Sequence, residues 1–240
     1  MENFSNDLYK PQNSHITSGD AQIPIYGPTH RLDVGGAIGN FWGYKVIDID
    51  SDGKWIYESP ETGKAVAYDD FAKVDENKMI IGNGLPKFYL SWNNSIRYKN
   101  FDFAVTMRGA FGYEILNFER MYYENTKTHQ LYNRLKTAYD PIFGKAVLNN
   151  DLDLEYNSYY IEKGDHWKID NITLGYTFNT KNWKYIDRLR IYASTLNTFV
   201  FTKYKGTDPE VSSTGLAPGN DLPNKYPTVR TFTFGLNISF

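Results

Sequence analysis

The segment DIDSDG comes closest to a known chemical pattern. Its residues Asp48, Asp50, Asp52 and Gly53 follow the order of a calcium-binding loop, in which alternating carboxylates coordinate the ion and a glycine permits a sharp turn. Ser59 stands where a bidentate carboxylate should close that loop. A solvated turn is therefore the favoured interpretation, and a calcium site is the alternative. We expect no other cofactor.

Patterns for catalysis are missing from the sequence. The chain has no cysteine, which excludes disulfides, thiolate metal ligands and cysteine nucleophiles. The glycines of VGGAIG do not complete a dinucleotide fingerprint, and neither a nucleophile elbow nor a phosphate loop occurs. The four histidines lack the spacing of metal ligands; they are His15, His30, His129 and His166. We therefore expect that the chain is not an enzyme.

Tyrosines gather in the longest connection expected between strands. Their rings could stack on a glycan or pack against a partner, whereas the favoured alternative is packing within a large folded loop. These residues are Tyr122, Tyr123, Tyr132, Tyr139, Tyr156, Tyr159 and Tyr160. In the loop 202–211, Gly206 and Pro209 favour a structural turn over ligand contact.

The composition points to strands as the elements that carry these residues. Aromatic residues make up 17% of the chain, an excess found in β proteins, in sugar-binding surfaces and in the aromatic girdles of outer-membrane barrels. The formal net charge of -2 provides no basic field for nucleic acid. No apolar run approaches the roughly 20 residues of a membrane helix, but the alternating strands of a membrane barrel also average out as hydrophilic.

Alternation of period two is clearest between Lys87 and Phe111. One face of the expected hairpin is apolar, with Phe88, Leu90, Trp92, Ile96 and Tyr98 followed by Phe101, Phe103, Val105, Met107 and Phe111. Lys99 and Asn100 form the turn between the two arms. Arms of roughly ten residues exceed the usual soluble strand of about 5 to 6 and match the length that crosses a bilayer.

Similar patterns predict strands near 38–49, 87–98, 101–112, 166–178, 188–201 and 228–240. The apolar phase of WKIDNITLGYTF jumps after Ile169, which predicts a β-bulge near Asp170 and Asn171. Long and short connections alternate strictly along the chain, as outer-membrane barrels require. Two aromatic girdles are expected, one with Tyr98, Phe101, Phe178, Trp183, Tyr185 and Phe240, the other with Phe88, Phe111, Trp167, Phe199 and Tyr226.

Five segments, in order, resemble the C-terminal barrel region of the SusC/RagA-type TonB-dependent outer-membrane transporters of Bacteroidetes. They extend from about Arg31 to Phe240 and are VGGAIGNFWGYKV, IIGNGLPKFYLSWNNSIRYKNFDF, YYIEKGDHWKIDNITLGYTF, LRIYASTLNTFVFTKYKGTDPEV and YPTVRTFTFGLNISF. The resemblance implies an all-β fold, an antiparallel transmembrane barrel of about 22 strands of which the chain supplies about six. Residues 1–37 would be a loop-like lead-in, and 38–240 the C-terminal part of the barrel.

The resemblance also implies function and partners. The complete transporter would import oligosaccharides or peptides through the outer membrane, with a SusD-like surface lipoprotein and with TonB, which contacts an N-terminal part outside this sequence. Thr233, Gly235, Ile238 and Phe240 resemble the terminal signal read by the barrel-assembly machinery. Six strands of a wide barrel cannot close on themselves, so we interpret the chain as a fragment or the product of a truncated gene.

Two rival interpretations stay open at this level. A soluble, aromatic-rich β-sandwich that binds glycans would show the same alternation within its strands, but it has no reason to place every long loop at one end. A passive porin would share the barrel wall with a transporter.

Partners under the favoured interpretation are outer-membrane lipid and a glycan or peptide substrate, and nucleic acid is excluded.

Overall fold

The computed structural model describes residues 15–125, 127, 133–212, 214–223 and 225–240. It divides into two compact units built from interleaved segments. The sheet unit comprises Pro86–Gly112, Gly164–Pro209 and Tyr226–Phe240, and the loop unit comprises Met1–Leu85, Tyr113–Lys163 and Glu210–Lys225. The chain therefore passes repeatedly between the two units.

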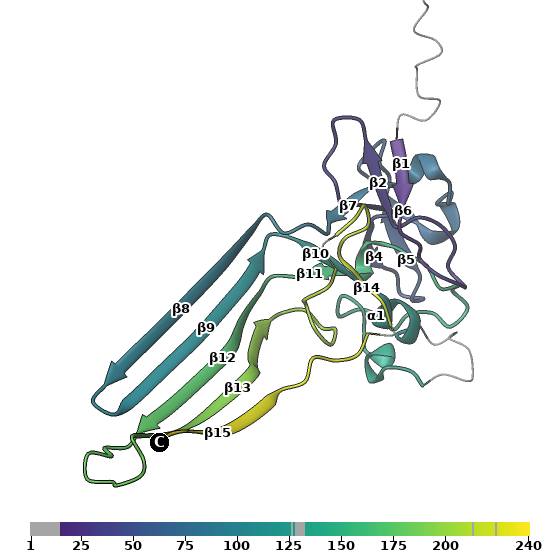
Figure 1. Cartoon of the computed structure of the whole chain (residues 1–240). Coiled ribbons are helices and arrows are strands. Elements are labelled where there is room, and N and C mark those ends of the chain that lie inside the picture. Colours follow the sequence, from purple (N-terminus) through teal and green to yellow (C-terminus); the bar gives the residue numbers. More distant parts are fainter. Residues whose placement is uncertain (1–14, 126, 128–132, 213, 224) are drawn as a thin grey trace, which may run out of the picture. The chain divides into compact units, whose positions relative to one another are not determined.

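Five long antiparallel strands form the sheet unit (Figure 1). Their spatial order is β15-β13-β12-β9-β8, and they are β8 (Phe88–Tyr98), β9 (Phe101–Phe111), β12 (His166–Thr177), β13 (Arg188–Thr202) and β15 (Thr231–Ser239). The shortest contains 9 residues and the longest 15. Strands are therefore confirmed in five of the expected ranges, and all five are unusually long.

The expected hairpin and the expected bulge are both confirmed. Phe88 pairs with Phe111, and Tyr98 with Phe101, on either side of a turn in which Lys99 has a φ of 53°. Along β12 the pairing with both neighbouring strands shifts between Ile169 and Asn171. The extra residue allows the apolar phase to resume on the same face of the sheet.

The single strand expected near 38–49 is wrong. That segment forms β3 (Asn40–Gly43) and β4 (Val46–Ile49), which belong to different sheets of the loop unit. Its apolar residues serve a core instead of a membrane-facing surface, since Phe41 and Ile49 are both buried in that unit. Five described strands, rather than about six, therefore form the long sheet. The lead-in 1–37 also differs from expectation, since its described part contains β1 (His15–Ser18) and β2 (His30–Asp33).

The loop unit consists of short strands and turns. Its four-stranded sheet has the order β1-β2-β3-β7, and two three-stranded sheets have the orders β4-β5-β6 and β11-β10-β14. The remaining bounds are β5 (Trp55–Glu58), β6 (Ala65–Ala67), β7 (Met79–Asn83), β10 (Glu114–Asn117), α1 (Phe118–Tyr123), β11 (Ile161–Lys163) and β14 (Asn220–Asp221). Short 3-10 turns cover 68–70, 75–77, 136–139 and 158–160. Among the described residues, no helix is both long and apolar enough to cross a membrane.

A hydrophobic core holds the loop unit together. Trp55, Tyr57, Phe118 and Met121 are at most 2% exposed and pack in one cluster with residues from all along the unit. Tyr57 stacks on Phe71 with ring centroids 4.2 Å apart. The segments expected to be long loops are therefore one folded unit, because their many aromatic residues supply enough apolar surface for a core.

His30 is buried against this core. Its Nε2 lies 2.8 Å from the carbonyl oxygen of Pro218, and its Nδ1 lies 2.8 Å from the Thr29 hydroxyl. A carbonyl only accepts, so Nε2 carries the proton and Nδ1 accepts from Thr29. Burial lowers the pKa of His30 from 6.5 to about 4, with the Pro218 hydrogen bond opposing the shift.

We expect the loop unit to lose stability in mild acid through His30. His30 binds a proton near pH 6.5 in the unfolded chain and only near pH 4 in the folded unit. Its contribution to the free energy of unfolding is therefore fully present above about pH 6.5 and is lost as the pH falls towards 4. The shift corresponds to about 3 kcal/mol of unfolding free energy. Urea unfolding at pH 7 and pH 4 measures it, and His30→Gln should abolish most of the difference. An unchanged difference in that variant would contradict the assignment.

Candidate functional site: a sheet with an apolar and a polar face

One face of the sheet unit is apolar across all five strands. Residues that pair directly across antiparallel strands project from the same face, and the pairings Ile96 with Phe103 and Leu174 with Phe103 connect three strands. The face carries Phe88, Leu90, Trp92, Ile96 and Tyr98 on β8, Phe101, Phe103, Val105 and Met107 on β9, Ile169, Ile172, Leu174 and Tyr176 on β12, Ile191, Ala193 and Phe199 on β13, and Phe232, Phe234, Leu236 and Ile238 on β15. Most are exposed; Phe234 reaches 83%.

Aromatic rings contact one another at both ends of this face. At the end with short turns, Phe101 contacts Tyr176, and Phe178 contacts both Tyr176 and Trp183. At the other end, Phe111 stacks between Phe88 and Trp167, with ring centroids 5.3 and 6.2 Å apart. These contacts join three residues of each expected girdle, and the girdles as a whole stay a prediction.

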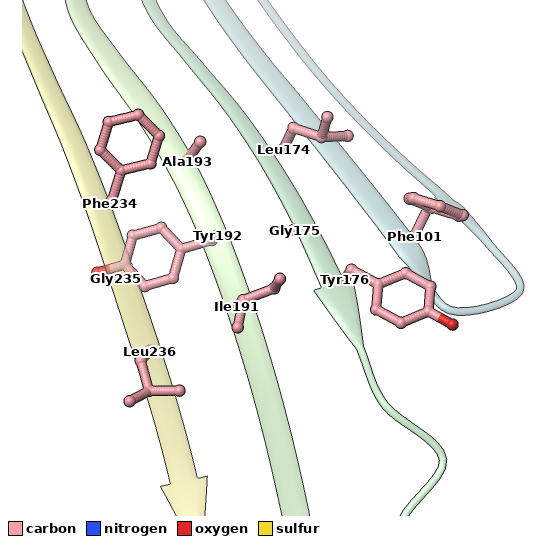
Figure 2. Close-up of a pocket in the computed structure, with 10 residues that line it drawn as sticks. All are labelled: Phe101, Leu174, Gly175, Tyr176, Ile191, Tyr192, Ala193, Phe234, Gly235 and Leu236. Atoms are coloured by element: carbon pink, nitrogen blue, oxygen red, sulfur yellow. The ribbon is translucent and has the colours of Figure 1, made fainter.

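A hollow of about 530 Å³ lies on the apolar face (Figure 2). Ala193 leaves room between larger neighbours on the adjacent strands, among them Leu174 on β12 and Phe234 on β15. Phe101, Tyr176, Ile191 and Leu236 also line it. Such a lining suits hydrocarbon better than a hydrated ligand, because it offers few polar groups to fix an orientation.

The opposite face carries polar and charged side chains. Arg190 on β13 donates two hydrogen bonds to Asp102 on β9, from Nε to Oδ1 at 2.9 Å and from Nη2 to Oδ2 at 2.5 Å. Strand β12 lies between these strands, and the ion pair crosses it at Gly175. A Cβ atom there would clash with Arg190 Nη2 and with the Asp102 carboxylate, so the absence of a side chain permits the pair.

A second charged group lies at the bulge. Arg108 Nε donates to Asp170 Oδ2 at 2.5 Å, and the Lys168 ammonium lies 3.8 Å from Asp170 Oδ1. Between the two ionic groups, Asn171 and Thr173 hydrogen-bond to the Ser194 hydroxyl at 3.1 and 3.0 Å. The bulge thus places the Asp170 carboxylate beside two cations. Ion pairs and hydrogen bonds between side chains connect neighbouring strands along the polar face.

The chain is similar to known proteins in sequence and in structure. The chain is 30% identical to "TonB-dependent receptor P3" of Formosa agariphila, over 88% of this chain and 23% of the relative. It is 35% identical to "TonB-dependent receptor SusC" of Bacteroides thetaiotaomicron, over 61% of this chain and 14% of the relative. The RagAB peptide importer in its closed-closed state covers 95% of this chain with a TM-score of 0.77 at 18% identity.

The chain belongs to the SusC-like TonB-dependent receptors. It spans less than a quarter of the length of these two curated relatives and 25% of the RagAB chain. The structural likeness is one of fold, all-β with sheets that are antiparallel apart from the β10–β14 pair. No protein-family model matches the chain.

The structure does not bring the carboxylates of the three calcium candidates together as a metal site within the described residues. Asp48 pairs with Lys145, which holds the pKa of the Asp48 carboxyl below its usual value. Asp50 Oδ1 instead accepts the backbone N–H groups of Asp52 and Lys54 at 2.9 and 2.8 Å, as in a local turn. Within the described residues, no group of three or more histidine, aspartate or glutamate side chains could hold a metal.

Most of the receptor's loop tyrosines pack within the loop unit. Tyr160 is 2% exposed, Tyr159 lies 5.1 Å from Trp55 between ring centroids, and the Tyr122 hydroxyl donates to Ala21 at 2.6 Å. Tyr123 is half-buried. Tyr139 is 60% exposed, so contact with a ligand stays a prediction for it, and Tyr132 lies outside the described residues.

The residues of the predicted assembly signal lie in and directly after β15, and those within the strand project from both faces of the sheet. Thr233 and Gly235 pair with Ser194 and Tyr192 on the polar face, and Ile238 pairs with Leu189 on the apolar face. Phe240 is 84% exposed. Gly235 also gives space to the Tyr192 ring (Figure 2), because a Cβ atom at this position would clash with it. The role in assembly stays a prediction.

Sequence reasoning missed the charged groups of the polar face. Asp102 and Arg190 are 88 positions apart, and neither stands in a motif. The signal that could have found them is their phase, since both fall on the polar side of their strands.

Proposed function

We propose that the five-stranded sheet is part of the wall of a transmembrane β-barrel in the outer membrane. The observation that carries the proposal is the separation of faces, apolar on one side and polar on the other, over five neighbouring strands of 9 to 15 residues. The apolar face would contact lipid and the polar face a hydrated lumen.

The complete receptor would be a SusC-like importer of oligosaccharides or peptides. The names of its relatives support dependence on TonB, and the likeness to RagAB, which is a peptide importer, supports a peptide as one class of cargo. We infer a SusD-like lipoprotein as partner, an assembly pathway through the barrel-assembly machinery, and no enzymatic step. The described residues here would contribute wall, lumen lining and a folded loop unit.

The soluble sandwich is less compatible with the same face. A sandwich covers the apolar side of one sheet with a second sheet, whereas the described residues of the sheet unit form a single sheet. An uncovered apolar face of this extent is unfavourable in water.

Extraction from membranes tests the proposal. We expect the receptor that carries this segment to stay in the membrane pellet during washes with alkaline carbonate and to leave it only with detergent. A peripheral membrane protein, treated in parallel, should leave with carbonate. Release of the receptor without detergent would contradict a place in the membrane wall.

A further inference from the structure

Two adjoining hollows lie at the short-turn end of the polar face. Each has a volume of about 400 Å³. The first is lined by Arg97, Asp102, Arg188, Arg190, Asn237, Ile238 and Ser239, and the second shares Arg97, Asp102 and Arg188 with it and adds residues of the two turns, including Lys99 and Lys181. We call the two hollows together the arginine basin.

The basin has more positive than negative charge. Asp102 is the one carboxylate among the lining residues, and it is engaged in the bidentate pair with Arg190. Arg97 and Arg188 also interact electrostatically with Asp102, but in the described part of the chain neither takes part in an ion pair of its own. Both are exposed. Two guanidinium groups are thus available to a ligand.

The register of the strands explains why these cations meet. In the backbone register, Arg97 lies opposite Asp102 on the neighbouring strand. Arg188 lies opposite Ser239, and Arg190 lies opposite Asn237. Gly175 on β12 leaves open the space through which Arg190 reaches Asp102. The Tyr192 ring, whose centroid lies 5.0 Å from the Arg190 guanidinium, supports that side chain from the next position of the same face.

We propose that the arginine basin binds the carboxylates of an acidic oligopeptide substrate as it passes along the polar face; this rests on the proposed function. The planar fork of a guanidinium matches a carboxylate with two parallel hydrogen bonds. The amide of Asn237 and the hydroxyl of Ser239 offer further polar contacts in the same hollow. Because the hollows adjoin, a ligand with two or more carboxylates engages Arg97 and Arg188 together.

Calorimetric titration of the detergent-solubilised receptor that carries this segment tests the proposal. Tetraglutamate is the probe, and tetraglutamine, equal in length but uncharged, is its control. We expect the affinity for tetraglutamate to be about tenfold higher or more, and to fall steeply with added salt because the charges are exposed. Combined Arg97→Gln and Arg188→Gln should remove most of that preference.

Two further variants separate charge from geometry. Lys184→Gln removes a cation that lies near Tyr185 and lines neither hollow, so it should leave the affinity unchanged. Arg97→Lys combined with Arg188→Lys keeps both positive charges but lacks the planar guanidinium fork. This variant should therefore keep only part of the preference for tetraglutamate.

Equal affinity for both peptides, or full affinity in the Arg97→Gln and Arg188→Gln variant, would overturn the proposal. Absence of binding of tetraglutamate to the unmodified receptor would also overturn it. Each of these results can be obtained while the receptor still resists carbonate extraction. Failure of this inference is therefore distinguishable from failure of the proposed membrane wall.

Discussion

Replacing Trp92 with arginine should prevent most of the receptor from assembling in the membrane, whereas replacing its neighbour Asn93 with arginine should not. Trp92 lies in the middle of β8, faces the apolar side opposite Met107, and is 49% exposed. Asn93 faces the polar side opposite Thr106. An arginine on a lipid-facing position near the bilayer midplane costs about 2 to 4 kcal/mol, and one on the lumen side costs much less.

The amount of receptor that resists extraction by urea from isolated membranes measures this effect. The two variants change adjacent positions of one strand and add the same side chain, so they differ chiefly in the face that receives the charge. Normal assembly of Trp92→Arg would contradict contact between the apolar face and lipid. Equal failure of both variants would show that β8 tolerates no arginine at its centre, whichever face receives it.

The long strands could be predicted because the polarity of each side chain indicates the face of the sheet from which it projects. Between Phe88 and Phe111 the alternation is nearly unbroken, and the single jump of phase after Ile169 was sufficient to locate the bulge. In a strand of eleven residues, a single residue that departs from the alternation does not change the assignment of the two faces. Five of the expected strands are therefore where the sequence places them.

The loop unit could not be predicted in the same way. A strand of four residues such as Val46–Ile49 is too short for its pattern to distinguish a membrane strand from a strand of a small buried sheet. The partners that decide between them lie far away in sequence, as when the Tyr57 hydroxyl donates to Glu155, 98 positions later. The same holds for Asp102 and Arg190, whose contact depends on a strand between them that has glycine at the crossing point.

Substituting methionine for Arg120 should destabilise the loop unit by about 3 to 5 kcal/mol, because it leaves two buried carboxylates without their cation. Arg120 is 6% exposed. Its Nε donates to Glu124 Oε1 at 2.9 Å, its Nη1 pairs with Glu162, and its guanidinium lies 4.9 Å from the Tyr159 ring centroid. Glu162 lies on β11 and Glu124 directly follows α1, so the arginine also connects two segments of the unit.

Lys127→Met is the matched control for Arg120→Met. Lys127 pairs with Asp153 at 2.7 Å, but both side chains are exposed, and exposed pairs contribute at most about 1 kcal/mol. Hydrogen exchange of the loop-unit amides reports the free energy of opening for both variants. Faster exchange around α1 and β11 in Arg120→Met alone is the expected result, because only the buried arginine compensates charges that water cannot reach. Equal exchange in the two variants would mean that water already reaches Glu124 and Glu162, and that the network contributes no more than a surface pair.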